Sequence, residues 1–255
     1  MTRAAVLAAA LLLTAAARAD ENEWQVPFIT TPTEVVERML EFAGTRPGDL
    51  VADLGSGDGR IVILAAQKFG ARGLGIELDQ SLVEKSRANA KAAKVEDLVR
   101  FVQGDVLETD FSQATVVTVY LLPGLITKLE RRFLTELAPG TRIVSHAFTM
   151  TGWKPDQTRL LRVAGAHPGQ GDESRLCLWI VPADVRGEWR GGPWRLRIEQ
   201  NYQEIEIEGA KEAKLSGREI SWTIGDASFR GRVDGATITG RVTRAGLASP
   251  LTLKR

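Results

Sequence analysis

The residues in this chain best suited to ligand chemistry lie between positions 51 and 59. Asp53 ends an apolar run that begins at Val51, and glycines follow at positions 55, 57 and 59. Glycine lets the backbone adopt conformations that a Cβ forbids, and it lets a ligand approach the main chain closely. A buried strand that ends in such a turn before a helix predicts the floor of a nucleoside pocket. The expected ligand contacts are Asp53, Gly55, Ser56, Gly57 and Gly59.

The residue after Gly59 distinguishes two classes of ligand. A dinucleotide fingerprint, G-x-G-x-x-G, requires a third glycine where this chain has Arg60. The carboxylates of Asp53 and Asp58 would repel a pyrophosphate, but they suit a ligand that carries positive charge. S-adenosylmethionine carries a sulfonium and an ammonium, so the turn favours this ligand. A glycine-rich loop that binds nothing is the alternative.

Two further acids follow the next predicted strands. Glu77 lies at the end of a strand over 73–79, and Asp105 lies at the end of a strand over 99–106. The carboxyl ends of parallel strands form the ligand-binding edge of a doubly wound sheet, so we expect Glu77 to bind ribose hydroxyls. Asp79 could share that role or cap the following helix. Asp105 is placed to bind an adenine amino group, with a turn carboxylate as the alternative.

The elements that would hold these acids alternate between strand and helix. Thr31 and Pro32 predict an N-cap and a first helical residue. Apolar spacing predicts helices over 32–42, 60–69, 82–90 and 125–137 and strands over 51–54, 73–79, 99–106, 114–122 and 141–148. An antiparallel pair at 159–163 and 175–181 closes the series. This order is typical of an α/β sheet with helices on both faces.

The composition excludes several other kinds of site. With 255 residues, 44% of them hydrophobic, the chain can bury a full core, and its net charge of +1 gives no basis for nucleic-acid binding. Cys177 is the only cysteine and lies in an apolar run, which predicts a buried thiol. The only histidines are His146 and His167, so we expect no metal site. His146 falls within a strand and is interpreted as structural rather than as a base.

The two ends of the chain differ from its centre. Residues 1–19 have one early positive charge, an Ala/Leu run, and Ala17-Arg18-Ala19 before Asp20, which predicts a secretory signal and an exported or periplasmic protein. The apolar run is short for a membrane span, so an uncleaved membrane anchor is the alternative. Residues 183–255 alternate apolar and polar positions between turns, which predicts a small antiparallel β-barrel or sandwich. Its role could be to cover the first domain or to mediate dimerisation. Residues 20–182 form the expected main domain.

Over residues 24–182 the chain resembles the class I S-adenosylmethionine-dependent methyltransferases. The resemblance rests on Asp53-Leu-Gly-Ser-Gly-Asp-Gly59, Glu77, Asp105 and the closing pair. It implies a Rossmann-like domain with a seven-stranded, mostly parallel sheet. By that similarity Asp53 and the glycines at 55, 57 and 59 bind the methionine part of the cofactor. Glu77 then binds the ribose and Asp105 the adenine end.

A narrower resemblance rests on four segments. They are Val26-Pro-Phe28 with Thr31-Pro32, Asp53 to Ile61, Tyr120-Leu-Leu-Pro123 and Pro139 to His146. These look like the lysine methyltransferases that modify the adenine nucleotide translocase and the ATP synthase c-subunit. The resemblance implies N-methylation of a protein lysine. The acceptor channel it implies is lined by Pro27, Phe28, Thr31, Tyr120 and Pro123.

The expected reaction is an in-line methyl transfer, in which the enzyme mainly holds the two reactants at attack distance. A lysine that arrives neutral requires no general base, and no catalytic acid or base is identified. A small-molecule acceptor is one alternative. Another is an exported binding or structural protein without turnover, because a cleaved signal would take the chain to a compartment where the cofactor is not known to be supplied.

Overall fold

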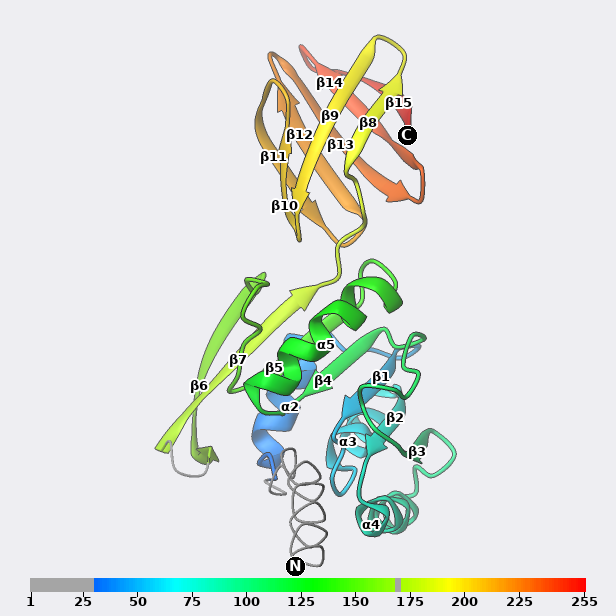
Figure 1. Cartoon of the computed structure of the whole chain (residues 1–255), viewed down its shortest axis with the longest axis vertical. Helices are drawn as coiled ribbons and strands as arrows, with labels where there is room; N and C mark the ends of the chain where they lie inside the picture. The colour runs from blue at the N-terminus through cyan, green and yellow to red at the C-terminus, as the bar shows by residue number, and fades with distance from the viewer. Residues whose placement is uncertain (1–29, 168–170) are drawn as a thin grey trace, which may run out of the picture.

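Seven strands form one sheet in the order β3-β2-β1-β4-β5-β7-β6 (Figure 1). The structure, a computed structural model, describes residues 30–167 and 171–255, so residues 1–19 and the channel candidates Pro27 and Phe28 lie outside the described residues. The strands are β1 Leu50–Leu54, β2 Arg72–Glu77, β3 Val99–Gln103, β4 Val116–Val119, β5 Arg142–His146, β6 Gln157–His167 and β7 Gly171–Ile180.

Strands β1 to β5 run parallel to one another, and β7 is antiparallel to both β5 and β6. The predicted seven-stranded, mostly parallel fold is confirmed. From β1 the strand order runs outward in both directions, to β2 on one side and to β4 on the other. Such a reversal opens a crevice at the carboxyl ends of the strands, where ligands bind in open α/β sheets.

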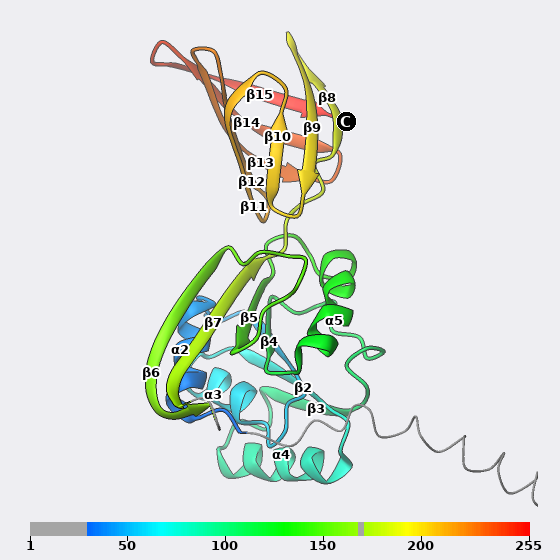
Figure 2. The ribbon, with the colours of Figure 1, turned by 60° about the vertical axis from the view of Figure 1, so that its left-hand side comes forward.

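Four described helices cover the two faces of this sheet (Figure 2). On one face lie α2 Thr33–Phe42, α3 Arg60–Phe69 and α4 Gln80–Ala92, which share one buried apolar cluster. On the other face α5 Pro123–Glu136 packs with the irregular segments 105–115 and 147–153. The apolar side of α2 is buried, as its spacing predicts. The sheet is thus a middle layer with both faces covered.

Several boundaries differ from the sequence prediction. The N-cap of α2 is Pro32, not Thr31, and it forms no side-chain cap. The Thr31 hydroxyl instead lies 3.4 Å from the Nδ1 atom of His146, so a tertiary contact takes the place of the capping bond. Strand β4 is shorter than predicted, because the chain leaves the sheet after Val119 and Pro123 opens α5. Strands β6 and β7 are longer than predicted.

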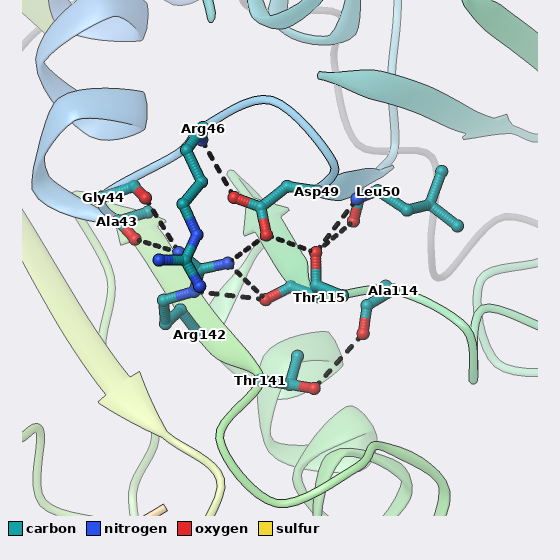
Figure 3. A network of polar contacts seen from close by, with 9 residues as sticks. All are labelled: Ala43, Gly44, Arg46, Asp49, Leu50, Ala114, Thr115, Thr141 and Arg142. Atoms are coloured by element: carbon teal, nitrogen blue, oxygen red, sulfur yellow. Dashed lines mark hydrogen bonds and ion pairs between the residues drawn. The ribbon is translucent and has the colours of Figure 1, made fainter. Parts of the chain in front are cut away.

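A polar network ties the amino ends of the strands together, at the edge opposite the crevice (Figure 3). The Arg142 guanidinium contacts the Asp49 carboxylate and donates to the Gly44 carbonyl at 2.8 Å. The Thr115 hydroxyl donates to Asp49 at 2.8 Å and accepts from the Leu50 N–H at 2.9 Å. Asp49 is buried, so its charge needs these partners. The network fixes β1, β4, β5 and the end of α2 relative to one another.

The C-terminal part is a single antiparallel sheet of eight strands in the order β10-β9-β8-β15-β14-β13-β12-β11. They are β8 Gly187–Gly191, β9 Trp194–Asn201, β10 Glu204–Ile207, β11 Ala210–Ser216, β12 Glu219–Ile224, β13 Ala227–Asp234, β14 Thr237–Arg244 and β15 Leu247–Lys254. The sheet curls around one apolar core that includes Trp189, Trp222 and Phe229 (Figure 1). It is therefore barrel-like, which is one of the two forms expected from the sequence.

Within residues 30–167 and 171–255, no helix has both the length and the apolar character needed to cross a membrane.

Candidate functional site

A cavity of about 860 Å³ opens at the carboxyl ends of the parallel strands. Eight of the residues predicted from the sequence line it together, namely Thr31, Asp53, Gly55, Ser56, Gly57, Glu77, Asp105 and Tyr120. Gly59 and Pro123 were also predicted, but neither lines the cavity. Gly59 is the N-cap of α3 and Pro123 is the first residue of α5. Both therefore shape elements that border the cavity.

Asp53 is the most deeply placed charge in the cavity. Its residue is 3% exposed, and its carboxylate accepts a 2.6 Å hydrogen bond from the Thr118 hydroxyl on β4. The pKa of Asp53 is raised to about 7, mainly by burial and also by the nearby carboxylates of Glu77 and Asp58, while the Thr118 bond opposes the rise. A bound cation would stabilise the ionised form. The site is thus suited to a positively charged ligand.

Asp58 has a different role from the one its sequence position predicts. The Arg60 guanidinium donates to both Asp58 carboxylate oxygens, at 2.9 and 2.7 Å, and this pairing lowers the pKa of Asp58. Arg60 also donates to the Thr31 carbonyl at 2.9 Å. The charge of Asp58 is therefore compensated within the chain. The pair attaches the segment before α2 to the glycine turn and leaves Asp53 as the acid that a cation would meet.

Glu77 holds the glycine turn through its carboxylate. It accepts hydrogen bonds from the N–H groups of Gly57 at 2.8 Å, Leu78 at 2.9 Å and Asp79 at 3.1 Å. Asp79 is the N-cap of α4 and accepts from the Ser81 N–H at 2.7 Å, so the capping interpretation is confirmed. Glu77 therefore connects the end of β2 to the loop after β1 while its residue lines the cavity.

Asp105 forms a turn, as one interpretation from the sequence expected, and it also lines the cavity. One carboxylate oxygen accepts from the Leu107 N–H at 2.8 Å. Four apolar residues that were not predicted also line the cavity, namely Leu78, Leu82, Val106 and Leu107. Their position in the sequence could have predicted three of them, because these three lie one or two residues after Glu77 or Asp105. They form an apolar wall on which a flat ring could pack.

Two glycines of the turn need their conformation for different reasons. Gly55 has φ +79, and an added Cβ would lie 2.8 Å from the Leu121 side chain. Gly59 has φ +80, and its added Cβ would lie 2.7 Å from the Phe101 ring on β3. Gly55 and the neighbouring Leu121 both line the cavity, whereas Gly59 packs against Phe101 of the sheet.

Tyr120 lines the cavity together with Thr31, and two further aromatic rings pack against it. The Tyr120 ring lies 4.3 Å from the His146 ring and 6.2 Å from the Phe148 ring, measured between centroids. His146 is fully buried, and its Nδ1 atom faces the Thr31 hydroxyl. This packing suits the structural interpretation of His146. Burial raises the pKa of the Tyr120 phenol, which stays protonated at neutral pH.

These residues fit S-adenosylmethionine. A buried carboxylate can meet its ammonium, a glycine turn leaves space for close approach, and an acid at the end of β2 can meet ribose hydroxyls. The ANTKMT methyltransferase domain family matches residues 53–157. The chain is also 42% identical, over 133 residues, to a protein-lysine N-methyltransferase of Saccharolobus islandicus. That match covers 52% of this chain and 83% of the relative. The chain belongs to this family of S-adenosylmethionine-dependent methyltransferases.

Two relatives from mouse match this chain over only about half of its length. The mouse lysine N-methyltransferase of the ATP synthase c-subunit is 37% identical over 52% of this chain, and the match spans 53% of that relative. The mouse adenine nucleotide translocase lysine N-methyltransferase is 37% identical over 57% of this chain and 63% of the relative. A crystal structure of an RNA methyltransferase from Salinibacter ruber, in complex with S-adenosylhomocysteine, is 50% identical with a TM-score of 0.56. The match covers 62% of this chain and 96% of the Salinibacter ruber chain.

Proposed function

We propose that this methyltransferase N-methylates the side chain of a protein lysine. The observation that carries the proposal is the match to a protein-lysine N-methyltransferase over 83% of that relative, and the charge of the cavity wall is compatible with it. Five acidic residues line the cavity, and the single basic residue among the described lining residues, Arg60, is paired with one of them. A cavity of this sign attracts a cationic side chain and repels a phosphate backbone. The names of the relatives in Saccharolobus islandicus and mouse support the same acceptor.

The residues proposed to hold the cofactor are those gathered at the carboxyl ends of β1, β2 and β3. Asp53 and the turn at Gly55 to Gly57 would bind its methionine part, Glu77 its ribose and Asp105 its adenine end. When bound, S-adenosylmethionine supplies an electrophilic methyl group on a positively charged sulfur. The apolar wall at Leu107 would exclude water from this side of the site.

The acceptor amine is proposed to enter beside Thr31 and Tyr120. The Tyr120 ring packs against the rings of His146 and Phe148, which restrict its position at the cavity wall. An aromatic face and a phenol oxygen can orient an amine for in-line transfer. Catalysis by such positioning needs no general base when the lysine is neutral. The expected contribution of the chain is therefore geometry rather than proton transfer.

RNA is the rival acceptor, because the Salinibacter ruber structure is described as an RNA methyltransferase. Small molecules are a second rival, and a binding protein without turnover is a third. The deciding experiment incubates the purified chain with tritiated S-adenosylmethionine and separated protein, RNA and small-molecule fractions of its native cells. We expect label in protein, on lysine by mass spectrometry, and none with the Asp53→Ala variant. Label in RNA or small molecules alone would overturn the lysine proposal, and no label in any fraction would favour the binding protein.

We also propose that residues 1–19 direct export, with cleavage after Ala19. The test is the intact mass of the protein recovered from its native cells. A mature chain that begins at Asp20 is expected, whereas an uncleaved chain in the membrane fraction would support the anchor instead.

A further inference from the structure

The barrel reaches the methyltransferase domain through the hairpin turn between β9 and β10. Asn201 pairs with Glu204, so Tyr202 and Gln203 are the two turn residues. Tyr202 has φ +54, in the left-handed region where glycine, asparagine or aspartate is usual. A bulky aromatic residue keeps this conformation only where its contacts compensate for the strain. The contacts of Tyr202 lie on the methyltransferase domain.

Tyr202 contacts two segments of that domain. Its ring is nearly parallel to the Trp153 ring, with centroids 5.6 Å apart and an angle of 6° between the planes. Its hydroxyl donates a hydrogen bond to the Glu130 carboxylate on α5, and this bond raises the pKa of Tyr202. An added Cβ on Gly152 would lie 2.8 Å from the same hydroxyl, so glycine leaves the room for it. The phenol is thus fitted between α5 and the segment 147–156.

Gln203 fixes the same segment with both atoms of its amide. The Oε1 atom accepts from the Trp153 indole at 2.6 Å, and the Nε2 atom donates to the Lys154 carbonyl at 2.8 Å. Trp153 is fully buried, and its carbonyl accepts from the Trp179 indole on β7 at 2.8 Å. The barrel therefore supplies two of the polar contacts that anchor the far end of this segment.

The near end of the segment packs against Tyr120, which lines the cavity. The segment begins directly after His146, and its Phe148 ring lies 6.2 Å from Tyr120 at an angle of 17°. Between the two ends, the Thr151 hydroxyl lies 3.3 Å from the Thr127 hydroxyl on α5. A continuous stretch of chain thus connects the acceptor wall of the cavity with the barrel turn.

We propose that Tyr202 and Gln203 are positioning residues for the methyl acceptor. They hold the segment 147–156 against α5, so that Phe148 supports Tyr120 at the acceptor wall. The inference rests on the proposed acceptor side of the cavity. It gives the barrel a role in acceptor use and none in cofactor binding, because neither turn residue lines the cavity.

Three variants of the full-length chain test this role. Tyr202→Gly removes the ring but relieves the positive φ, so a residue that served only the turn should tolerate the change. Tyr202→Phe keeps the ring and loses only the bond to Glu130. Gln203→Ala removes both amide contacts without touching the strained position. The matched control is Ala245→Gly, since Ala245 has φ +49 in an exposed two-residue turn between β14 and β15.

Two measurements are made on each variant. Hydrogen exchange follows the amides of Ala147 and Phe148, which donate to the carbonyls of Arg175 and His146, against the amides of β1. Steady-state methylation of a peptide carrying the labelled lysine gives KM for the acceptor and for S-adenosylmethionine. For Tyr202→Gly and Gln203→Ala we expect about tenfold faster exchange at the two amides and at least a fivefold loss of acceptor kcat/KM. The KM of the cofactor should change less than twofold, and Tyr202→Phe should lie nearer to wild type.

The outcomes separate this inference from the proposed function. Unchanged exchange in both variants overturns the inference, and so does faster exchange with unchanged acceptor kcat/KM. An equal effect of Ala245→Gly would also overturn it, because the effect would then belong to the barrel as a whole. If the wild-type protein methylates RNA or a small molecule instead of protein, the lysine proposal fails. The acceptor kcat/KM of each variant is then measured with that acceptor. If no acceptor is labelled, both proposals are overturned.

Discussion

The Thr118 hydroxyl donates a 2.6 Å hydrogen bond to the Asp53 carboxylate, and Asp53 is a buried residue at the wall of the cavity. The bond connects β4 to β1 at the point where the strand order reverses. Thr118 favours the ionised form of Asp53, and burial favours the neutral form more strongly, so the pKa rises to about 7. Two pH dependences follow from this balance.

The first concerns ligand affinity. A cationic ammonium binds the ionised carboxylate, and with a pKa of about 7 the ionised fraction rises about tenfold between pH 6 and pH 8. We therefore expect the Kd of S-adenosylhomocysteine, measured by calorimetry, to fall by a similar factor over this range. Asp53→Asn should weaken binding and remove most of the slope. An equal slope in the variant would show that Asp53 is not the titrating group.

The second concerns the stability of the protein without ligand. The folded pKa of Asp53 lies above its ordinary value of 3.8, so the folded state holds the proton more tightly. The contribution of Asp53 to the free energy of unfolding is therefore full below about pH 4 and is lost as the pH rises to about 7. Relative to Asp53→Asn, the wild type should lose about 3 kcal/mol between pH 5 and pH 8. Urea denaturation at the two pH values measures the difference, and parallel curves would contradict the prediction.

Gly55 and Gly59 should respond differently to alanine. Both have positive φ, so each substitution should cost about 1 kcal/mol of folding free energy from the backbone alone. Gly59→Ala should cost more, because its Cβ would meet the Phe101 ring inside the core, and cofactor affinity should change little. Gly55→Ala should weaken S-adenosylhomocysteine binding at least tenfold, since the site depends on its close approach. Thermal denaturation and calorimetry on the pair decide this, and the reverse pattern would contradict the assignment of Gly55 to the cavity.

Arg142 should contribute to stability without affecting the site. Removing its guanidinium leaves the buried Asp49 carboxylate without its cation, so Arg142→Ala should cost about 3 kcal/mol or more. Cofactor affinity should not change, because the network lies at the amino ends of the strands and the cavity at their carboxyl ends. The matched control is Arg190→Ala, whose exposed pair with Glu188 should contribute less than about 1 kcal/mol. Equal losses in the two variants would contradict the structural role of Arg142.

The sequence was sufficient to predict the sheet, its helices and most of the cofactor side of the cavity. Glu77 and Asp105 could be predicted because local strand patterns end at them and parallel strands bring their ends together. The pairing of Asp58 with Arg60 was missed, although the two residues are near in sequence, because a carboxylate in a glycine turn also suits a cationic ligand. Strand β11 has little apolar alternation to predict it, because Leu215 is the only large apolar side chain in it.

Contacts between distant segments were the hardest to predict. Thr31 carries an N-cap signal, but the His146 ring, 115 residues away, decides what its hydroxyl contacts. Tyr202 occupies a turn position where local preference favours glycine, and Glu130 and Trp153 explain it only once the two domains are placed together. Local patterns contain no information on such partners. The acceptor side of the site depends on contacts of this kind, and the resemblance to lysine methyltransferases was needed to predict it.

Substitutions of Tyr120 and Pro123 test which residues contact the methyl acceptor. Both were predicted to line the channel, but only Tyr120 lines the cavity, while Pro123 opens α5. Tyr120→Ala should lower acceptor kcat/KM at least tenfold, because it removes the wall that orients the amine, and Tyr120→Phe should keep part of the activity. Pro123→Ala should change acceptor kcat/KM less than threefold, since alanine is compatible with the first turn of a helix. Calorimetry with S-adenosylhomocysteine checks that each variant still binds the cofactor. A Pro123→Ala variant as impaired as Tyr120→Ala would place the acceptor along α5 rather than against the aromatic wall.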